Sequence, residues 1–322
     1  MNDNLQVTIT RRHFAELVDA GPTPLPEAGE VAGPTLCSLV SPGTELADSY
    51  GGEKFPATSG YAAVFEVRQI GEGVEGIAVG DRVFAMGKHS QYQRFRADRV
   101  MPVPVGLEPQ VACVVRLMGV SMTTLVTTKA RPGERVAVTG LGPVGYLCAQ
   151  MAQLCGYEVL AAEPDADRRA MAEAGGLKWT MNRLPVEDPS IAGTVALVAE
   201  CSGHEQAVLD GCKVVRRQGE VVLIGVPWAR RTDVFAHAIL DAVFHRYVTL
   251  RSGWEWKIPL ERGPYNPVGI FDNFSTALRW LAEGRIPLKG LLQPHAPAEA
   301  NELYQALLHR RAPGLFHYFD WR

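Results

Sequence analysis

Three glycines carry the clearest chemical signal in this sequence. Gly140, Gly142 and Gly145 stand in a GxGxxG pattern within RVAVTGLGPVGYLCAQMA, after an apolar strand-like run and at the start of a helix-like run. Such glycines permit a tight turn, close approach of a pyrophosphate and close helix packing, while the helix N-terminus attracts phosphate. The pattern predicts a dinucleotide site that also includes Pro143 and Val144. A glycine turn without a cofactor is the alternative.

An acidic residue at the expected distance supports the cofactor interpretation. Glu163 ends the next apolar run, EVLAAE, eighteen residues after Gly145, near the spacing of a carboxylate that bonds ribose hydroxyls. A 2′-phosphate beside Glu163 would meet like charge, so the sequence favours NAD. NADP stays open because Arg168 and Arg169 could reach a phosphate. Three further residues complete the predicted cofactor-binding set: Cys201, Gly225 and Val226.

The surrounding chain contains elements able to hold such a site. Residues 25–115 contain short β-type runs separated by Gly and Pro turns, which predicts a compact, mostly antiparallel β domain. Residues 119–250 alternate apolar strands with helices, the pattern of a parallel sheet covered on both faces. Beyond residue 262 two amphipathic helices and a strand-like FHYFDW are predicted.

Composition excludes several classes of partner. The 322 residues carry a net charge of −3 and are 47% hydrophobic, which gives no reason to expect nucleic acid or an anionic membrane. No apolar run approaches the length of a transmembrane helix, and MNDNLQVTITRRHF lacks the apolar segment of a signal peptide. We therefore expect a cytoplasmic protein. We also expect a homodimer with a small molecule as its partner. The six cysteines form no CxxC pair and are interpreted as buried apolar residues.

The order of the motifs resembles the medium-chain dehydrogenase/reductase superfamily. The resemblance rests on GEGVEGIAVGDRVF, then RPGERVAVTGLGPVGYLCAQMAQLCGYEVLAAEPDADRR, VALVAECSGHEQAV, RRQGEVVLIGV and ALRWLAEGRI, and covers nearly the whole chain. It implies an α/β protein with a GroES-like β-rich catalytic domain at residues 1–118. It also implies a Rossmann domain with a doubly wound parallel sheet at 119–262, and a return to the catalytic domain at 263–322.

The same resemblance indicates that the catalytic zinc of many such enzymes is missing. Where zinc-dependent members carry a His–Glu pair, this chain has Tyr61 and Ala62, and Ser41 occupies the position nearest the first zinc cysteine. The third ligand falls on Val115 or Arg116. A catalytic zinc requires three protein ligands and one open position, so the chain resembles a zinc-independent branch. A shifted site built from Cys37, Cys113 and His89 is the alternative, which we disfavour because a shift of four strand residues moves a side chain roughly 13 Å.

Hydrogen-bond donors could replace part of the metal's effect on a developing alkoxide. The candidates are Thr44, which matches a proton-relaying hydroxyl residue in related enzymes, Glu45 beside it, and Tyr61 in place of a metal ligand. Each also has a structural interpretation: Thr44 completes a turn, Glu45 pairs with a surface cation, and Tyr61 fills the vacant metal cavity. His89 is a further candidate for proton transfer, although a loop histidine is usually a surface group.

The sequence thus predicts an NAD(H)-dependent, zinc-independent oxidoreductase that interconverts a secondary alcohol and a ketone. Trp254 and Lys257, in SGWEWKIP, would suit a sugar or cyclitol ring, or else lie at a domain or subunit contact. A quinone or enone reductase is the nearest alternative enzyme. A non-catalytic dinucleotide-binding sensor or partner subunit is the alternative of a different class.

Overall fold

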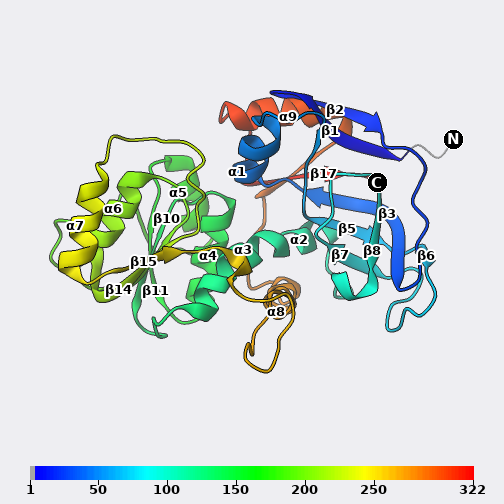
Figure 1. Cartoon of the computed structure of the whole chain (residues 1–322). Helices are drawn as coiled ribbons and strands as arrows, with labels where there is room; N and C mark the ends of the chain where they lie inside the picture. Colours follow the sequence, from blue (N-terminus) through cyan, green and yellow to red (C-terminus); the bar gives the residue numbers. More distant parts are fainter. Residues whose placement is uncertain (1–3) are drawn as a thin grey trace. The chain divides into compact units, whose positions relative to one another are not determined.

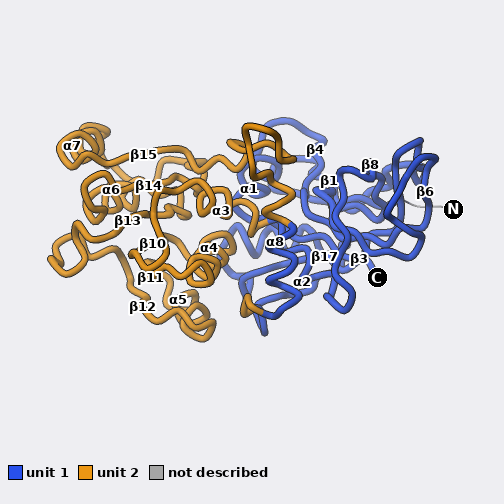
Figure 2. The backbone as a smooth tube through the Cα atoms, turned by 90° about the horizontal axis from the view of Figure 1, so that it is seen from below, with its two compact units in different colours: residues 1–116, 275–284, 288–322 blue, residues 117–274, 285–287 orange. Residues whose placement is uncertain are grey.

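The computed structural model describes residues 4–322, which form two compact units (Figure 2). Unit 1 comprises the chain up to Arg116 together with Ser275–Gly284 and Leu288–Arg322, and unit 2 comprises Leu117–Phe274 and Arg285–Pro287. The first change of unit lies close to the predicted boundary at residue 118. Residues 263–274, which the sequence assigned to the C-terminal return, pack with unit 2. The division into functional domains stays a prediction.

Unit 1 is β-rich, as predicted. Its strands form one sheet in the order β2-β1-β4 and a larger one in the order β16-β17-β3-β5-β7-β9, with β6 and β8 also paired to β3 (Figure 1). All these pairs are antiparallel except β16 with β17. The strands are β1 (Leu5–Arg11), β2 (Phe14–Asp19), β3 (Glu30–Leu39), β4 (Ala57–Thr58), β5 (Ala63–Glu66), β6 (Gln69–Ile70), β7 (Arg82–Ala85), β8 (Tyr92–Arg96), β9 (Val100–Pro102), β16 (Leu292–His295) and β17 (Phe316–Asp320).

Short helical segments complete unit 1. The long strand β3 pairs with β8 through its first half and with β5 through its second, and the chain then enters a tight helical turn at Pro42. Apolar side chains of β1, α9 and β17 form one core cluster, which includes Tyr50 and Tyr304. The segments are α1 (Pro42–Thr44), the π-helical η1 (Glu45–Tyr50), the 3₁₀ turns η2 (Ala97–Arg99) and η4 (Pro297–Glu299), α2 (Pro109–Cys113) and α9 (Ala300–Leu308).

Unit 2 is the predicted doubly wound parallel sheet. Its six strands run in the order β12-β11-β10-β13-β14-β15, all parallel. Helices α4 and α6 lie on opposite sides of this sheet (Figure 1), and every residue of β13 is buried, as expected for a sheet covered on both faces. The elements are β10 (Arg135–Thr139), α4 (Pro143–Leu154), β11 (Glu158–Ala162), α5 (Ala166–Ala174), β12 (Trp179–Met181), β13 (Val195–Glu200), α6 (Glu205–Val214), β14 (Val215–Leu223), α7 (Ala236–Arg246), β15 (Thr249–Ser252) and the 3₁₀ turn η3 (Glu255–Lys257).

Two helices span the changes of unit along the chain. They are α3 (Val115–Thr127) and α8 (Ile270–Ala282). The helical segment Pro109–Thr127 is 19 residues long and apolar enough to cross a membrane by length and composition, which corrects the expectation that no apolar run approaches that length. Most of the segment is buried within the protein, as is common for the core helix of a globular protein.

Candidate functional site

The glycine turn of unit 2 joins β10 to α4. Gly140 has φ +80°, and a Cβ there would lie 2.8 Å from Cβ of Ser202. A Cβ on Gly145 would collide with the Gly140 carbonyl oxygen. At Gly142, by contrast, a Cβ would meet nothing nearer than Nη1 of Arg168, at 3.9 Å. The turn is therefore packed where strand and helix meet and open at Gly142, which fits the approach of a phosphate.

The first turn of α4 adds donors to this opening. Gly142 is the N-cap residue and provides no side chain, and Pro143 follows it at the start of the helix. The N–H groups of Val144 and Gly145 belong to the first turn, which has no intrahelical acceptors. Together with the helix dipole they make an anion site. These residues fit the pyrophosphate of a dinucleotide.

Glu163 lies directly beside the turn. Its carboxylate accepts hydrogen bonds from the Leu141 N–H at 2.7 Å and from the Asp165 N–H at 3.1 Å, and Nη1 of Arg168 lies 3.7 Å from Oε2. Arg169 instead donates to the backbone carbonyl of Glu163 at 2.6 Å. Glu163 therefore connects the glycine turn to the end of β11, where a ribose ligand is expected. Of the two candidate phosphate-binding cations, Arg168 is the one whose guanidinium lies beside the Glu163 carboxylate and Gly142.

The other predicted cofactor residues follow the ends of β13 and β14. The Cys201 N–H donates to the Thr139 carbonyl at 2.8 Å, and the Gly225 N–H donates to the Glu200 carbonyl at 2.7 Å. These bonds connect the turns that follow β10, β13 and β14 at the carboxyl edge of the sheet, where doubly wound proteins bind their ligands. Val226 follows Gly225 and is partly exposed.

Glu200 is a residue that the sequence reasoning missed. It is fully buried, and its carboxylate accepts from the Ser202 N–H at 2.7 Å, the Gly203 N–H at 3.1 Å, and the hydroxyls of Ser202 and Thr139. Burial raises its pKa, and these hydrogen bonds oppose that rise. An acid at the end of an apolar strand, directly before a Ser-Gly turn, is the signal that could have indicated it.

Unit 1 contains the positions that the resemblance relates to zinc ligands. Among residues 4–322 no group of three His, Cys, Asp or Glu side chains is placed to hold a metal ion. Cys37 and Cys113 do lie together, with their sulfur atoms 3.3 Å apart and both side chains buried. His89 is engaged elsewhere, as described below.

A cluster of three hydroxyl groups occupies this part of unit 1. The Tyr61 hydroxyl donates to Oγ of Ser41 and lies 3.4 Å from Oγ1 of Thr44. Ser41 and Thr44 flank the Pro42 turn that follows β3, and Tyr61 lies two residues before β5, which pairs with β3. We call Ser41, Thr44 and Tyr61 the hydroxyl cluster. It brings two predicted catalytic residues, Thr44 and Tyr61, into one hydrogen-bonded group.

Glu45 lies behind the hydroxyl cluster and not at the surface. Only 2% of its surface is exposed, and its carboxylate accepts from the Ser41 N–H at 2.7 Å, His89 Nε2 at 3.0 Å and the Tyr304 hydroxyl at 2.6 Å. Burial, followed by the charge of Glu45, raises the pKa of Tyr304, which keeps this phenol a donor. The Ser59 hydroxyl is 2.7 Å from the Tyr304 hydroxyl. The structural interpretation in which Glu45 pairs with a surface cation is therefore wrong.

His89 is fully buried, which corrects its expected place in a surface loop. Trp321 donates its indole N–H to Oγ of Ser38 at 2.9 Å, so the Ser38 hydroxyl is left to donate to Nδ1 of His89 at 2.8 Å. Nε2 of His89 then carries the hydrogen that it donates to Glu45. We call Glu45, His89, Tyr304, Ser38, Ser59 and Trp321 the Glu45 network. Its bonds satisfy the carboxylate and hold the backbone of Ser41.

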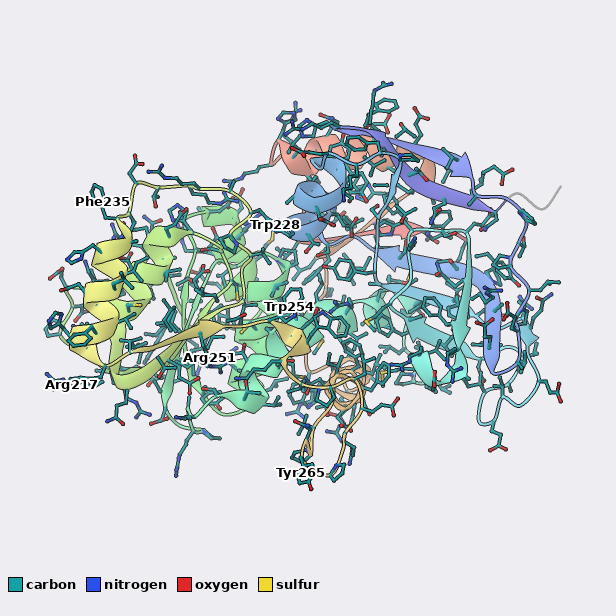
Figure 3. All side chains as sticks on the ribbon, in the orientation of Figure 1. Arg217, Trp228, Phe235, Arg251, Trp254 and Tyr265 are labelled. Carbon is teal, nitrogen blue, oxygen red and sulfur yellow. The ribbon has the colours of Figure 1, made fainter. Side chains whose placement is uncertain are left out.

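The predicted substrate residues lie in unit 2, just after β15. Trp254, labelled in Figure 3, has an exposed side chain, and Lys257 ends the short turn η3. Trp228 follows β14 and is 46% exposed. Because β14 and β15 are parallel, the loops carrying Trp228 and Trp254 leave the same edge of the sheet as the glycine turn. Exposed aromatic faces at this edge are available to a ligand.

The two units, one a β-rich GroES-like fold and the other a Rossmann fold with its glycine turn, have the fold of a medium-chain dehydrogenase/reductase. The chain is similar to zinc-binding dehydrogenases, L-threonine dehydrogenases and alcohol dehydrogenases of this superfamily. A family model described as zinc-binding dehydrogenase matches residues 143–254. The family resemblance and the fold class predicted from the sequence are thereby confirmed.

Individual relatives support this assignment at low identity. L-threonine 3-dehydrogenase from Pyrococcus horikoshii is 27% identical over 285 residues, which cover 75% of this chain and 81% of that protein. The structure of galactitol-1-phosphate dehydrogenase from Escherichia coli matches with a TM-score of 0.82 at 17% identity, covering 98% of this chain and 99% of the other. Acetophenone reductase from Geotrichum candidum, in complex with NAD, also matches with a TM-score of 0.82, at 16% identity, covering 99% and 98%. These structural matches show the fold.

Proposed function

We propose that the protein is an NAD(H)-dependent, zinc-independent oxidoreductase that interconverts a secondary alcohol and a ketone on a small polar substrate, such as a sugar or cyclitol. The observation that carries the proposal is the hydroxyl cluster, because it offers hydrogen-bond donors at positions that the resemblance relates to a metal site. A dinucleotide cofactor is supported by the open glycine turn and by nicotinamide dinucleotides in related structures. We also propose, as the sequence predicts, a homodimer in the cytoplasm.

The chain's own residues would perform binding and proton transfer. A dinucleotide held by the glycine turn at Gly140, Gly142 and Gly145 would supply the chemistry of hydride transfer to or from the substrate carbon. When substrate binds, the Tyr61 hydroxyl releases its bond to Oγ of Ser41 and donates its single hydrogen to the substrate oxygen, on which negative charge develops during reduction. Thr44, within hydrogen-bond reach of Tyr61, exchanges the proton that the oxygen gains or loses. Glu45 and His89 hold the cluster in place from behind, so we assign them a positioning role.

Turnover separates this proposal from its alternatives. Purified protein is incubated with NAD⁺ and a panel of polyols, cyclitols and simple secondary alcohols, and NADH formation and carbonyl products are measured. A ketone product supports the proposal. Reduction of a conjugated C=C bond in place of C=O would identify a quinone or enone reductase, and NADH binding without turnover of any substrate would favour a sensor.

Activity is expected to survive removal of metal ions. Because Ser41, Tyr61 and Val115 or Arg116 stand where the resemblance places ligands, we expect much less than one zinc per chain and unchanged turnover after incubation with a chelator. Elemental analysis of the purified protein and assays before and after chelation check this. One tightly bound zinc per chain contradicts the proposal.

NADH is expected to bind at least about tenfold more tightly than NADPH, which corresponds to about 1.4 kcal/mol. The 2′-phosphate of NADPH would be repelled by the carboxylate of Glu163. It would also replace the ribose hydroxyl that donates a hydrogen bond to that carboxylate in NADH. Calorimetric titration of both cofactors measures the ratio. Glu163→Gln keeps an acceptor for the Leu141 N–H but removes the charge, so the preference should shrink in that variant. Equal affinities in the parent protein contradict the assigned role of Glu163.

A further inference from the structure

A buried guanidinium lies against the hydroxyl cluster. Arg116 is only 4% exposed, and its Cζ lies 4.6 Å from the centroid of the Tyr61 ring. A guanidinium over an aromatic face is attracted by the ring's negative face, and this attraction is strongest where water is excluded. Arg116 therefore restrains the plane of the ring whose hydroxyl reaches Ser41 and Thr44.

The charge of Arg116 also acts on the Tyr61 oxygen. Burial is the largest influence on the Tyr61 pKa and raises it. The hydrogen bonds to Ser41 and Thr44 and the charge of Arg116 lower it, while Glu45 raises it. A positive charge that favours the phenolate also polarises the phenolic O–H bond and makes it a stronger donor.

Glu45 does not cancel this effect by bonding to the same hydroxyl. Its carboxylate is directed at the Ser41 N–H, His89 and Tyr304. The hydroxyl of Tyr61 thus contacts two neutral hydroxyls, while a positive group lies over its ring. This arrangement suits an oxygen that must stabilise negative charge on a neighbouring atom.

We propose that Arg116 is a positioning residue for the reaction: it orients the Tyr61 ring and strengthens the hydrogen bond from Tyr61 to the substrate oxygen as charge develops there. The inference rests on the proposed role of Tyr61 and deepens it. In this proposal the positive charge that assists the reaction belongs to Arg116 and acts through the Tyr61 hydroxyl.

Two Arg116 variants separate charge from packing. Arg116→Met keeps an unbranched side chain of similar length without the charge, and Arg116→Lys keeps the charge without the planar guanidinium. We expect Arg116→Met to lower kcat by about tenfold with little change in KM, and Arg116→Lys to recover part of that loss. We expect the higher kcat in Arg116→Lys because that variant keeps the positive charge, whereas a loss of fold stability alone would not depend on charge.

A double-mutant cycle then shows whether the effect passes through the Tyr61 hydroxyl. In the Tyr61→Phe background, which keeps the ring, Arg116→Met should change kcat by less than about twofold. An equal fall in both backgrounds would mean that Arg116 supports the fold alone, and would overturn the inference. Thermal melting of all four proteins accompanies the kinetics.

A measurement without turnover distinguishes this inference from the proposed function. In protein carrying ¹³Cζ-labelled tyrosine, the Tyr61 signal is assigned by its loss in Tyr61→Phe and titrated with base by NMR. We expect Tyr61 to ionise at a higher pH in Arg116→Met than in the parent and in Arg116→Lys. An unchanged titration overturns the inference even if the enzyme is active. A Tyr61→Phe variant as active as the parent overturns the proposed role of Tyr61 instead.

Discussion

Tyr61→Phe is expected to lower kcat by about 100-fold or more while leaving NADH affinity nearly unchanged. The substitution removes one oxygen and keeps the ring, so packing and the stacking of Arg116 are preserved. Removing a donor that stabilises a developing oxyanion typically costs a factor of 10² to 10³. Steady-state kinetics with the substrate found by the turnover screen, and NADH titration by fluorescence, measure the two effects.

Tyr61→Ala separates chemistry from packing at the same position. Loss of the ring leaves a void, and we expect a decrease of about 3 to 5 kcal/mol in the free energy of unfolding. If the Phe variant is fully active and only the Ala variant is unstable, Tyr61 is a filler of the site. Proton transfer would then have to be reassigned to Thr44 or a bound water.

Glu45→Ala is expected to lower the free energy of unfolding by about 3 to 5 kcal/mol. The change leaves three buried donors without their acceptor, namely the Ser41 N–H, His89 Nε2 and the Tyr304 hydroxyl. Removing one side of a buried polar network costs the desolvation of the groups that remain. Equilibrium unfolding in urea measures the loss.

Two control variants test whether the lower free energy of unfolding comes from the lost hydrogen bonds of Glu45. Glu45→Gln retains a carbonyl oxygen that can accept, so it should be less destabilising than Glu45→Ala. Glu75→Ala removes an exposed carboxylate in unit 1 and should change stability by no more than about 0.5 kcal/mol. A Glu45→Ala protein as stable as the Glu75→Ala protein would show that the network contributes nothing to the fold.

The sequence was most informative about unit 2. Its strands are short and apolar and its helices carry a clear period, so β10, α4 and β11 are visible in RVAVTG, PVGYLCAQMAQLCG and EVLAAE. Gly145 could also be understood locally, because strand, turn and helix follow one another within a few residues. The strands and helices of such a sheet can be recognised from local sequence pattern, and the crossovers between its parallel strands are almost always right-handed.

Unit 1 illustrates why other features could not be predicted. Glu45 and His89 were identified as candidates by type, yet their burial depends on Tyr304 and Trp321, which are separated from Glu45 and Ser38 by 259 and 283 residues. No local pattern reports a contact over such a distance. Cys37 and Cys113 were placed together only in the disfavoured shifted metal site, because each cysteine by itself is interpreted as an ordinary buried residue.

The long separations within the Glu45 network have a consequence for how the protein is made. A ribosome synthesises residues 117–274 of unit 2 before Tyr304 and Trp321, so the glycine turn can fold while the polar interior of unit 1 still lacks two of its members. During that interval Glu45 and His89 have been synthesised but are only partly buried, and water must supply their missing hydrogen bonds. We therefore expect a nascent chain arrested before residue 300 to acquire cofactor affinity in unit 2 while unit 1 remains open to proteases, so that synthesis passes through a stage able to bind dinucleotide and unable to turn over substrate.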